Sequence, residues 1–99
     1  MKNKKTIWGQ TLVKNEGRFI WFSVKSVIDH LDRLLIWDTG STDSTIEIIK
    51  LLQKEYPQKI IFKEIGEVNA KEITQARQRM LDETKSDWFI ILDGDEVWW

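Results

Sequence analysis

A chain of 99 residues with 41% hydrophobic and 31% charged residues has the size and composition expected of one soluble domain. The length excludes two full domains, and six Trp, four Phe and many Ile and Leu residues exclude a disordered chain. The net charge of −1 provides no overall field that would favour nucleic acid or an anionic membrane.

Cysteine is absent and His30 is the single histidine, which excludes disulfides, thiolate metal sites and multi-histidine zinc sites. This composition suits a reducing cytoplasm, which is the expected location. The apolar stretch 6–13 contains Gln10 and is too short for a signal peptide or a membrane span.

The first part of the chain predicts two strands separated by a helix. Residues 7–13 are rich in β-branched and aromatic residues and predict a strand. The apolar residues that follow share one helical face: Ile20, Val24, Val27, Ile28 and Leu31. A second apolar run, Leu34–Trp37, predicts another strand that ends at Asp38.

A capped helix is expected after the second strand. Gly40 allows a tight turn, and Ser44 and Glu47 have the spacing of a capping box. Ser41 and Asp43 are interpreted as capping residues of this helix. The positive end of the helix dipole also favours polar and acidic side chains at this place. The helical face is formed by Thr45, Ile48, Ile49 and Leu52. Tyr56-Pro57-Gln58 ends the helix, because proline cannot continue its hydrogen bonds.

The second part of the chain repeats the alternation of strand and helix. Residues 59–65 predict a third strand, and Asn69 and Glu72 form another cap pair. The helix that follows has its apolar residues at helical spacing: Ile73, Ala76, Met80 and Leu81. Five consecutive apolar residues, 88–92, predict a strand that is buried on both faces.

This order, β-α-β-α-β-α-β, predicts an α/β fold with a Rossmann-like parallel sheet, strand order 3-2-1-4 and helices on both faces. In such sheets, ligands bind beyond the carboxyl ends of the strands, at the switch in strand order. Three polar clusters follow strands at this edge: Lys14-Asn15-Glu16, Asp38-Thr39-Gly40-Ser41 and Asp93-Gly94-Asp95. With this order, Asn15 and Asp93 flank the switch point and Asp38 lies beside it.

Asp93 and Asp95 are candidate ligands of a divalent metal ion. In an extended chain, residues two apart project to the same side, and two carboxylates placed so require a cation. Mg²⁺ or Mn²⁺ is suited, because it takes one or two carboxylates and completes its shell with water and substrate phosphates. The alternative is an ordinary acidic turn. The position of the pair after an apolar strand favours the metal site.

Asp38 and Arg77 are candidate ligand-binding residues. An acidic residue at the end of a strand, before a helix, can accept hydrogen bonds from a base or ribose. Alternatively, Asp38 and Ser41 only stabilise the turn and cap the helix. Arg77 lies near the apolar stripe of the third helix, from which a guanidinium could bind a diphosphate through paired hydrogen bonds. Arg77 could equally cover the core or pair with Glu72 or Asp82.

Asp38-Thr39-Gly40-Ser41 also matches the active-site signature of aspartic proteases, in which two aspartates share a proton. Small retroviral-type proteases are dimers of chains of about this length. Their folds are almost entirely β-structure, whereas residues 44–52 have helical periodicity and capping residues. The protease is therefore the less favoured alternative.

Four segments occur in the order typical of one enzyme family: Leu12–Glu16, Trp37–Thr45, Ala76–Gln78 and Asp93–Glu96. With them, nearly the whole chain from Thr11 onward resembles the nucleotide-binding half of a family 2 glycosyltransferase with the GT-A fold. The resemblance implies a donor that is a UDP- or GDP-linked sugar and an acceptor hydroxyl of unidentified class.

The resemblance also implies roles for individual residues. Glu16 and Asp38 would meet the base and ribose, and Arg77 the diphosphate. Asp93 would approach the ribose and the metal shell, and Asp95 would bind the metal that bridges the phosphates. The metal would offset the charge that develops on the departing diphosphate.

The sequence differs from the common family pattern at two positions, and the chain is shorter than the members of the family. Lys14 stands where many members place an aromatic residue against the base, and Gln78 replaces a common asparagine. The chain stops before the acceptor-binding elements and the general base of the family, so residues 1–99 are expected to form a donor-binding subdomain without a catalytic base. A non-catalytic binding module is the alternative, and the apolar Val97-Trp98-Trp99 segment then predicts a homodimer.

Overall fold

The computed structural model describes residues 5–92 and contains a four-stranded parallel sheet with the order β3-β2-β1-β4. Its strands are β1 (Ile7–Val13), β2 (Arg33–Asp38), β3 (Ile60–Glu64) and β4 (Trp88–Ile91). Its helices are α1 (Ile20–Val27), the short 3₁₀ helix η1 (Ile28–His30), α2 (Thr45–Glu55) and α3 (Ala70–Glu83). The predicted α/β alternation and the strand order 3-2-1-4 are confirmed.

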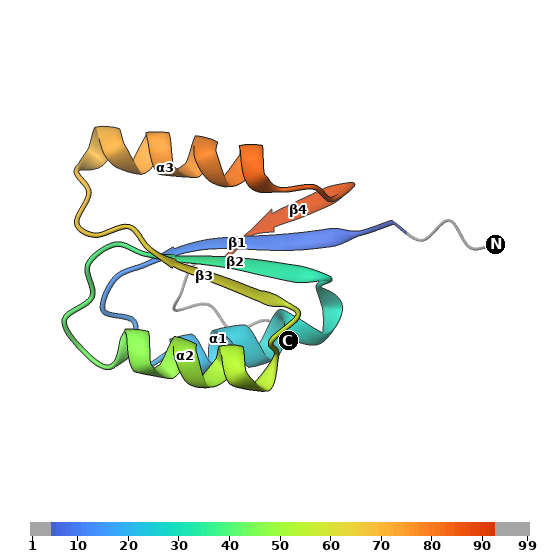
Figure 1. Cartoon of the computed structure of the whole chain (residues 1–99), viewed down its shortest axis with the longest axis horizontal. Coiled ribbons are helices and arrows are strands. Elements are labelled where there is room, and N and C mark those ends of the chain that lie inside the picture. Colours follow the sequence, from blue (N-terminus) through green and yellow to red (C-terminus); the bar gives the residue numbers. More distant parts are fainter. Residues whose placement is uncertain (1–4, 93–99) are drawn as a thin grey trace.

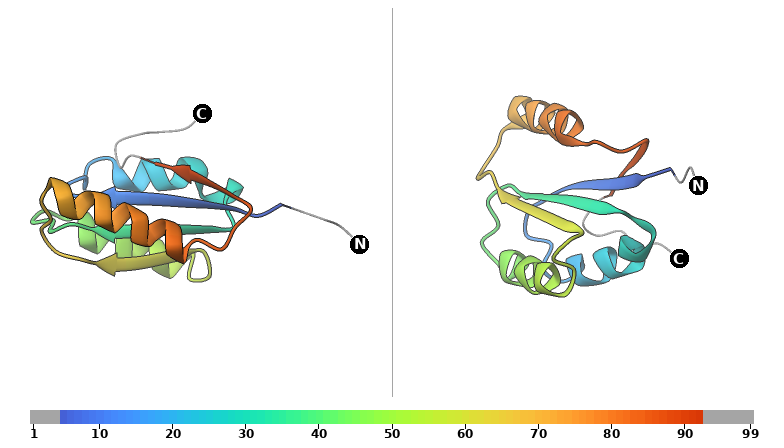
Figure 2. Two further views of the ribbon diagram at one scale, coloured as in Figure 1. Left: turned by 90° about the horizontal axis from the view of Figure 1, so that it is seen from above. Right: turned by 45° about the vertical axis from the view of Figure 1, so that its right-hand side comes forward.

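The sheet lies between two helical layers, with α1 and α2 on one face and α3 on the other (Figure 1). Because side chains alternate along a strand, β2 contributes to both layers. Leu34 and Ile36 pack in the core beneath α1 and α2, whereas Leu35 and Trp37 pack with Ala76 of α3. The expectation of helices on both faces is therefore confirmed, and the right-hand view in Figure 2 shows the same three layers.

Helix α3 packs on a smaller hydrophobic core than α1 and α2 do. Of its predicted apolar face, Ala76 and Met80 are buried, whereas Ile73 and Leu81 are each 38% exposed. The end of α3 is attached to β1 by a polar contact, since the Gln10 side-chain amide donates to Thr84 Oγ1 at 2.7 Å. Helix α3 therefore contacts the sheet through Ala76 and Met80, this hydrogen bond and an ion pair between Glu83 and Lys63 of β3.

The prediction that residues 88–92 form a strand buried on both faces is wrong for β4. Trp88 is 62% exposed, Phe89 45% and Ile91 52%, whereas Leu92 is buried. The physical reason is position: β4 lies at the edge of the sheet and, within residues 5–92, pairs with β1 alone. A run of apolar residues indicates that a strand can be buried on both faces, but neighbouring elements decide whether it is.

None of the helices between residues 5 and 92 combines the length and the apolar character needed to cross a membrane. Asp93, Asp95 and the Val97-Trp98-Trp99 segment lie outside the described residues.

Candidate functional site

The carboxyl ends of β1, β2 and β3 meet at one edge of the sheet, where their loops are joined by hydrogen bonds. Thr39 follows β2, and its backbone N–H and its hydroxyl both donate to the carbonyl oxygen of Val13, at 2.9 and 3.1 Å. The N–H of Ile65, which follows β3, donates to the carbonyl oxygen of Asp38 at 2.8 Å. The edge where ligands bind in such sheets is thus a connected structure.

Asp38 ends β2 with a carboxylate that is engaged in its own turn. The residue is 1% exposed. Its Oδ2 accepts the N–H groups of Gly40 and Ser41 at 3.0 and 2.9 Å, and its Oδ1 accepts the Ser41 hydroxyl. A carboxylate has about four acceptor positions, and the contacts within residues 5–92 use three of them. The turn-stabilising contacts weighed for Asp38 and Ser41 are therefore present.

The aspartic-protease alternative is excluded by the surroundings of Asp38. The Asp38-Thr39-Gly40-Ser41 segment joins a central parallel strand to α2, in an α/β fold with helices on both faces. Aspartic proteases carry this signature in a fold that is almost entirely β-structure.

Asn15 connects the loop after β1 to the loop after β2. Its side-chain oxygen accepts the backbone N–H groups of Thr42 and Asp43 at 2.8 and 3.3 Å, and its own N–H donates to Ser41 Oγ at 2.9 Å. Its φ of 53° is left-handed, a conformation that asparagine tolerates better than most residues. The sequence placed Asn15 at the switch point but did not predict this bridging role.

Asp43 lies two residues before α2 and binds both the start of that helix and the loop after β1. Its Oδ1 accepts the N–H of Thr45 at 2.9 Å and the Thr45 hydroxyl, and its Oδ2 accepts the N–H of Gly17 at 3.2 Å. The hydrogen bonds from the Thr45 hydroxyl and N–H, with a smaller contribution from Gly17, hold the pKa of Asp43 below its ordinary value of 3.8. Asp43 thus binds the first N–H of α2, as a capping residue does. The same interpretation is wrong for Ser41, whose side chain binds Asp38 and Asn15 and not the start of the helix.

The predicted capping box of Ser44 and Glu47 is wrong. Ser44 precedes the first residue of α2, but its side chain makes no capping hydrogen bond. Its ψ of 6° departs from the extended backbone that normally directs a capping side chain at the first turn. The predicted pair at α3 is confirmed, because Asn69 has a ψ of 178° and forms a capping box with Glu72.

Glu16 and Arg77 lie on different sides of the sheet edge. Glu16 is half-buried at the start of α1, where its carbonyl oxygen accepts the N–H groups of Phe19 and Ile20 at 2.9 and 2.8 Å. Arg77 is half-buried on α3, about 10 Å along the helix from its first residue. Among residues 5–92, the ion pairs of the structure do not include Arg77.

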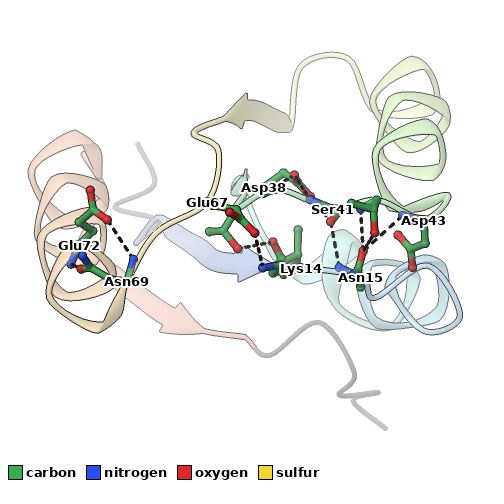
Figure 3. A network of polar contacts seen from close by, with 12 residues as sticks. Lys14, Asn15, Asp38, Ser41, Asp43, Glu67, Asn69 and Glu72 are labelled. Carbon is green, nitrogen blue, oxygen red and sulfur yellow. Dashed lines mark hydrogen bonds and ion pairs between the residues drawn. The ribbon is translucent and has the colours of Figure 1, made fainter.

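A depression with a volume of about 410 Å³ lies between the loop after β1 and the start of α3. It is lined by Lys14, Glu67, Val68, Asn69 and Glu72. Lys14 Nζ lies 3.3 Å from Glu67 Oε1, and a dashed line in Figure 3 marks this ion pair. The sequence did not single out Glu67 or Val68. The available signal was that both follow the third strand, at the same edge as the three polar clusters.

Gly40 brings the Asp38 turn against this depression. Its φ of 95° is left-handed, and a Cβ at this position would lie 2.9 Å from Glu67 Cγ and 3.2 Å from Glu67 N. Glycine is therefore required both by the turn, as predicted, and by the close approach of the two loops.

The metal ligands predicted from the sequence, Asp93 and Asp95, lie outside the described residues. Leu92, which precedes them, extends the pairing of β4, since its N–H donates to the carbonyl oxygen of Gln10 at 2.9 Å. Within residues 5–92, no three His, Cys, Asp or Glu side chains are grouped so that they could hold a metal ion.

Sequence comparison identifies one matching family and several relatives. The model of Glycosyl transferase family 2 matches residues 11–98. The SPbeta prophage-derived glycosyltransferase SunS of Bacillus subtilis (strain 168) is 28% identical over 93 residues, which cover 94% of this chain and 21% of that protein. A TPR repeat-containing protein of Synechococcus elongatus is 29% identical over 90 residues, which cover 86% of this chain and 19% of that protein. The chain thus spans about a fifth of the length of these curated relatives.

The fold is also found in a solved enzyme structure. A mannosyltransferase from Pyrobaculum calidifontis, in complex with GDP-Man and Mn²⁺, matches with a TM-score of 0.78 and 17% sequence identity. The match covers 96% of this chain and 29% of that one. At this identity the likeness establishes the fold, and the expected GT-A-type arrangement of the sheet is confirmed.

Proposed function

The chain belongs to glycosyl transferase family 2, and from this premise we propose that it binds a nucleoside diphosphate sugar and presents it for transfer to an acceptor hydroxyl. The observation that carries the proposal is the edge at which the loops after β1, β2 and β3 are hydrogen-bonded together around Asp38 and Asn15. This edge adjoins the switch in strand order between β1 and β4, the usual ligand position in doubly wound sheets.

We propose that the nucleoside lies at the edge formed by Glu16 and Asp38. Contacts within residues 5–92 use three of the about four acceptor positions of the Asp38 carboxylate, and the fourth is proposed to accept a hydroxyl or N–H donor of the nucleoside. Arg77 is proposed to bind the diphosphate, because a guanidinium can donate paired hydrogen bonds to phosphate oxygens.

We propose Asp95, with Asp93 beside it, as the ligands of Mg²⁺ or Mn²⁺. Two carboxylates and the phosphates of the donor are the oxygen ligands that these ions prefer. Such a cation would offset negative charge on the departing diphosphate. The mannosyltransferase with the same fold was solved with GDP-Man and Mn²⁺, which supports this choice.

We propose that residues 1–99 bind and orient the donor. Asp38, Asn15 and Asp43 keep three loops in one arrangement before the ligand arrives, so little conformational freedom is lost on binding. No residue of this chain is assigned as the base that deprotonates the acceptor. Sugar transfer itself is proposed for the longer type of protein to which the curated relatives belong.

Isothermal titration calorimetry with GDP and with UDP, each with and without Mn²⁺, tests donor binding. We expect binding that depends on the metal and is lost in Asp95→Asn. Asp29→Asn is the matched control, because Asp29 is exposed in η1, before β2, and so lies at the opposite end of the sheet. Absence of binding to either nucleotide, or equal binding by Asp95→Asn, would contradict the proposal.

A second candidate function is an interaction module that forms a homodimer. The observation that favours it is the exposure of Trp88, Phe89 and Ile91 on the edge strand β4, since exposed edge strands with apolar side chains promote pairing. Sedimentation velocity over a range of concentrations tests it. A protein that remains monomeric at high concentration excludes the dimer, and a deletion of Trp98 and Trp99 that stays fully dimeric excludes the terminal segment as its cause.

A further inference from the structure

The depression beside the Asp38 turn lies next to the proposed nucleoside position. Its wall is formed by Glu67, which contacts Gly40 of that turn so closely that a Cβ at Gly40 would lie 2.9 Å from Glu67 Cγ. Lys14 forms an ion pair with Glu67 and directly precedes Asn15 and Glu16 of the loop after β1 (Figure 3). A base attached to a ribose near Asp38 could therefore enter this depression.

Two of the polar residues that line the depression, Asn69 and Glu72, are hydrogen-bonded to each other. Asn69 Oδ1 accepts the N–H of Glu72 at 2.9 Å, and Glu72 Oε1 accepts the N–H of Asn69 at 3.0 Å. These contacts cap α3, so changing them would expose the first amides of the helix. Asn69 and Glu72 are therefore assigned to the helix rather than to a ligand.

Lys14 and Glu67 are the charged residues of the depression that are not used in capping α3 and so can contact a ligand. Their side chains are 47% and 82% exposed, and their charged atoms lie 3.3 Å apart. An ion pair this exposed contributes little to stability, so both groups can turn toward a ligand at small cost. Val68, which is half-buried, adds apolar surface on which the face of a base can pack.

The pair presents one donor beside two acceptors. The Lys14 ammonium donates, and the two oxygens of the Glu67 carboxylate accept. Guanine carries the complementary series along one edge: the O6 acceptor, the N1–H donor and the N2–H donor. We infer that Lys14 and Glu67 select guanine as the base of the donor. This inference rests on the proposed function and specifies its substrate class.

The other bases fit the pair less well. Uracil presents O4, N3–H and O2, so the second carboxylate oxygen of Glu67 would face a carbonyl oxygen and repel it. Cytosine and adenine present an amino group and a ring nitrogen acceptor, which leave one carboxylate oxygen without a donor. A bidentate, charge-assisted contact favours the matching base by about tenfold or more.

Calorimetry with GDP and UDP in the presence of Mn²⁺ tests the inference. We expect the unaltered chain to bind GDP at least about tenfold more tightly than UDP. In Glu67→Gln the side chain presents one acceptor and one donor, which with Lys14 matches uracil. We therefore expect this variant to lose its preference for GDP and to bind UDP as tightly or more tightly. Asp29→Asn, with the same loss of charge, should keep the preference for GDP.

Each outcome separates the inference from the proposed function. Equal binding of both nucleotides, or tighter binding of UDP, by the unaltered chain overturns the guanine assignment and leaves donor binding intact. A preference for GDP that persists in Glu67→Gln overturns the role of Glu67. Absence of binding to either nucleotide overturns the proposed function and, with it, the inference. Circular dichroism of the variant checks its fold, which we expect to be unchanged because Glu67 is exposed.

Discussion

The side-chain oxygen of Asn15 accepts the backbone N–H of Thr42 at 2.8 Å and so joins the loops that follow two neighbouring strands. The two residues are 27 positions apart in the sequence, yet they act as one unit of the site. Because Asn15 also accepts from Asp43 and donates to Ser41, one asparagine sets the spacing between the β1 and β2 ends of the proposed donor site.

We expect Asn15→Ala to destabilise the fold by about 1–3 kcal/mol. The substitution leaves the N–H groups of Thr42 and Asp43 without their acceptor and places alanine at a left-handed φ. Urea unfolding monitored by Trp fluorescence measures the change. Asn15→Asp retains an acceptor oxygen and is the matched control. Equal losses in both variants would show that the lost hydrogen bonds are not the cause.

We expect Gly40→Ala to weaken both stability and nucleotide binding more than Gly66→Ala. Both glycines have a left-handed φ, at 95° and 76°, so alanine carries a similar backbone cost of about 1–2 kcal/mol at each. Only at Gly40 would the added Cβ meet the backbone and side chain of Glu67, since Gly66 has open space. Unfolding and calorimetry on both variants provide the comparison. Identical behaviour of the two would contradict the close packing of Gly40 on Glu67.

We expect Arg77→Ala to weaken nucleotide binding by at least about tenfold, the loss typical of a charged hydrogen bond. Its stability should change little, because Arg77 takes part in none of the ion pairs within residues 5–92. Arg79→Ala is the matched control: Arg79 lies 5.2 Å from the ring centre of the buried Trp37, so its loss should affect stability and spare binding. If Arg77→Ala lowers stability and leaves nucleotide binding unchanged, Arg77 has a structural role and does not bind the diphosphate.

We expect the stability of the chain to fall on acidification in part through Asp43. Its hydrogen bonds from Thr45 and Gly17 lower its pKa in the folded state, so the ionised carboxylate favours folding. This contribution is complete above the unfolded pKa of 3.8 and is lost as the pH falls through the lower pKa of the folded state. Urea midpoints between pH 3 and pH 7 should therefore depend less on pH in Asp43→Asn. An unchanged pH dependence in that variant would contradict this role.

The order of the elements and the edge of the sheet that carries the polar residues could be predicted from the sequence. Alternation of strands and helices is a local pattern, since apolar residues recur with a period of two or of 3.6. The buried face of α1, with Ile20 and Val24, follows from that spacing alone. Chain alternation then implies a parallel sheet, and a parallel sheet gathers the loops after its strands at one edge.

The contacts of the site could not be predicted, because they join residues far apart in the chain. Asp43, rather than Ser44, binds the first turn of α2, since backbone angles at Ser44 direct its side chain elsewhere. The approach of Glu67 to Gly40 depends on how the loop after β3 folds back over the loop after β2. Such geometry is decided by packing rather than by local preference.

The sequence by itself therefore determined the α/β order, the edge of the sheet and the family-like motifs, because these depend on local periodicity and residue type. Only the tertiary structure decided that Asp38 is engaged in its own turn, that Lys14 forms an ion pair with Glu67 beside a depression and that β4 is exposed at the sheet edge. The physical reason is that hydrogen-bond partners and burial depend on neighbours brought together by folding, which no local pattern specifies.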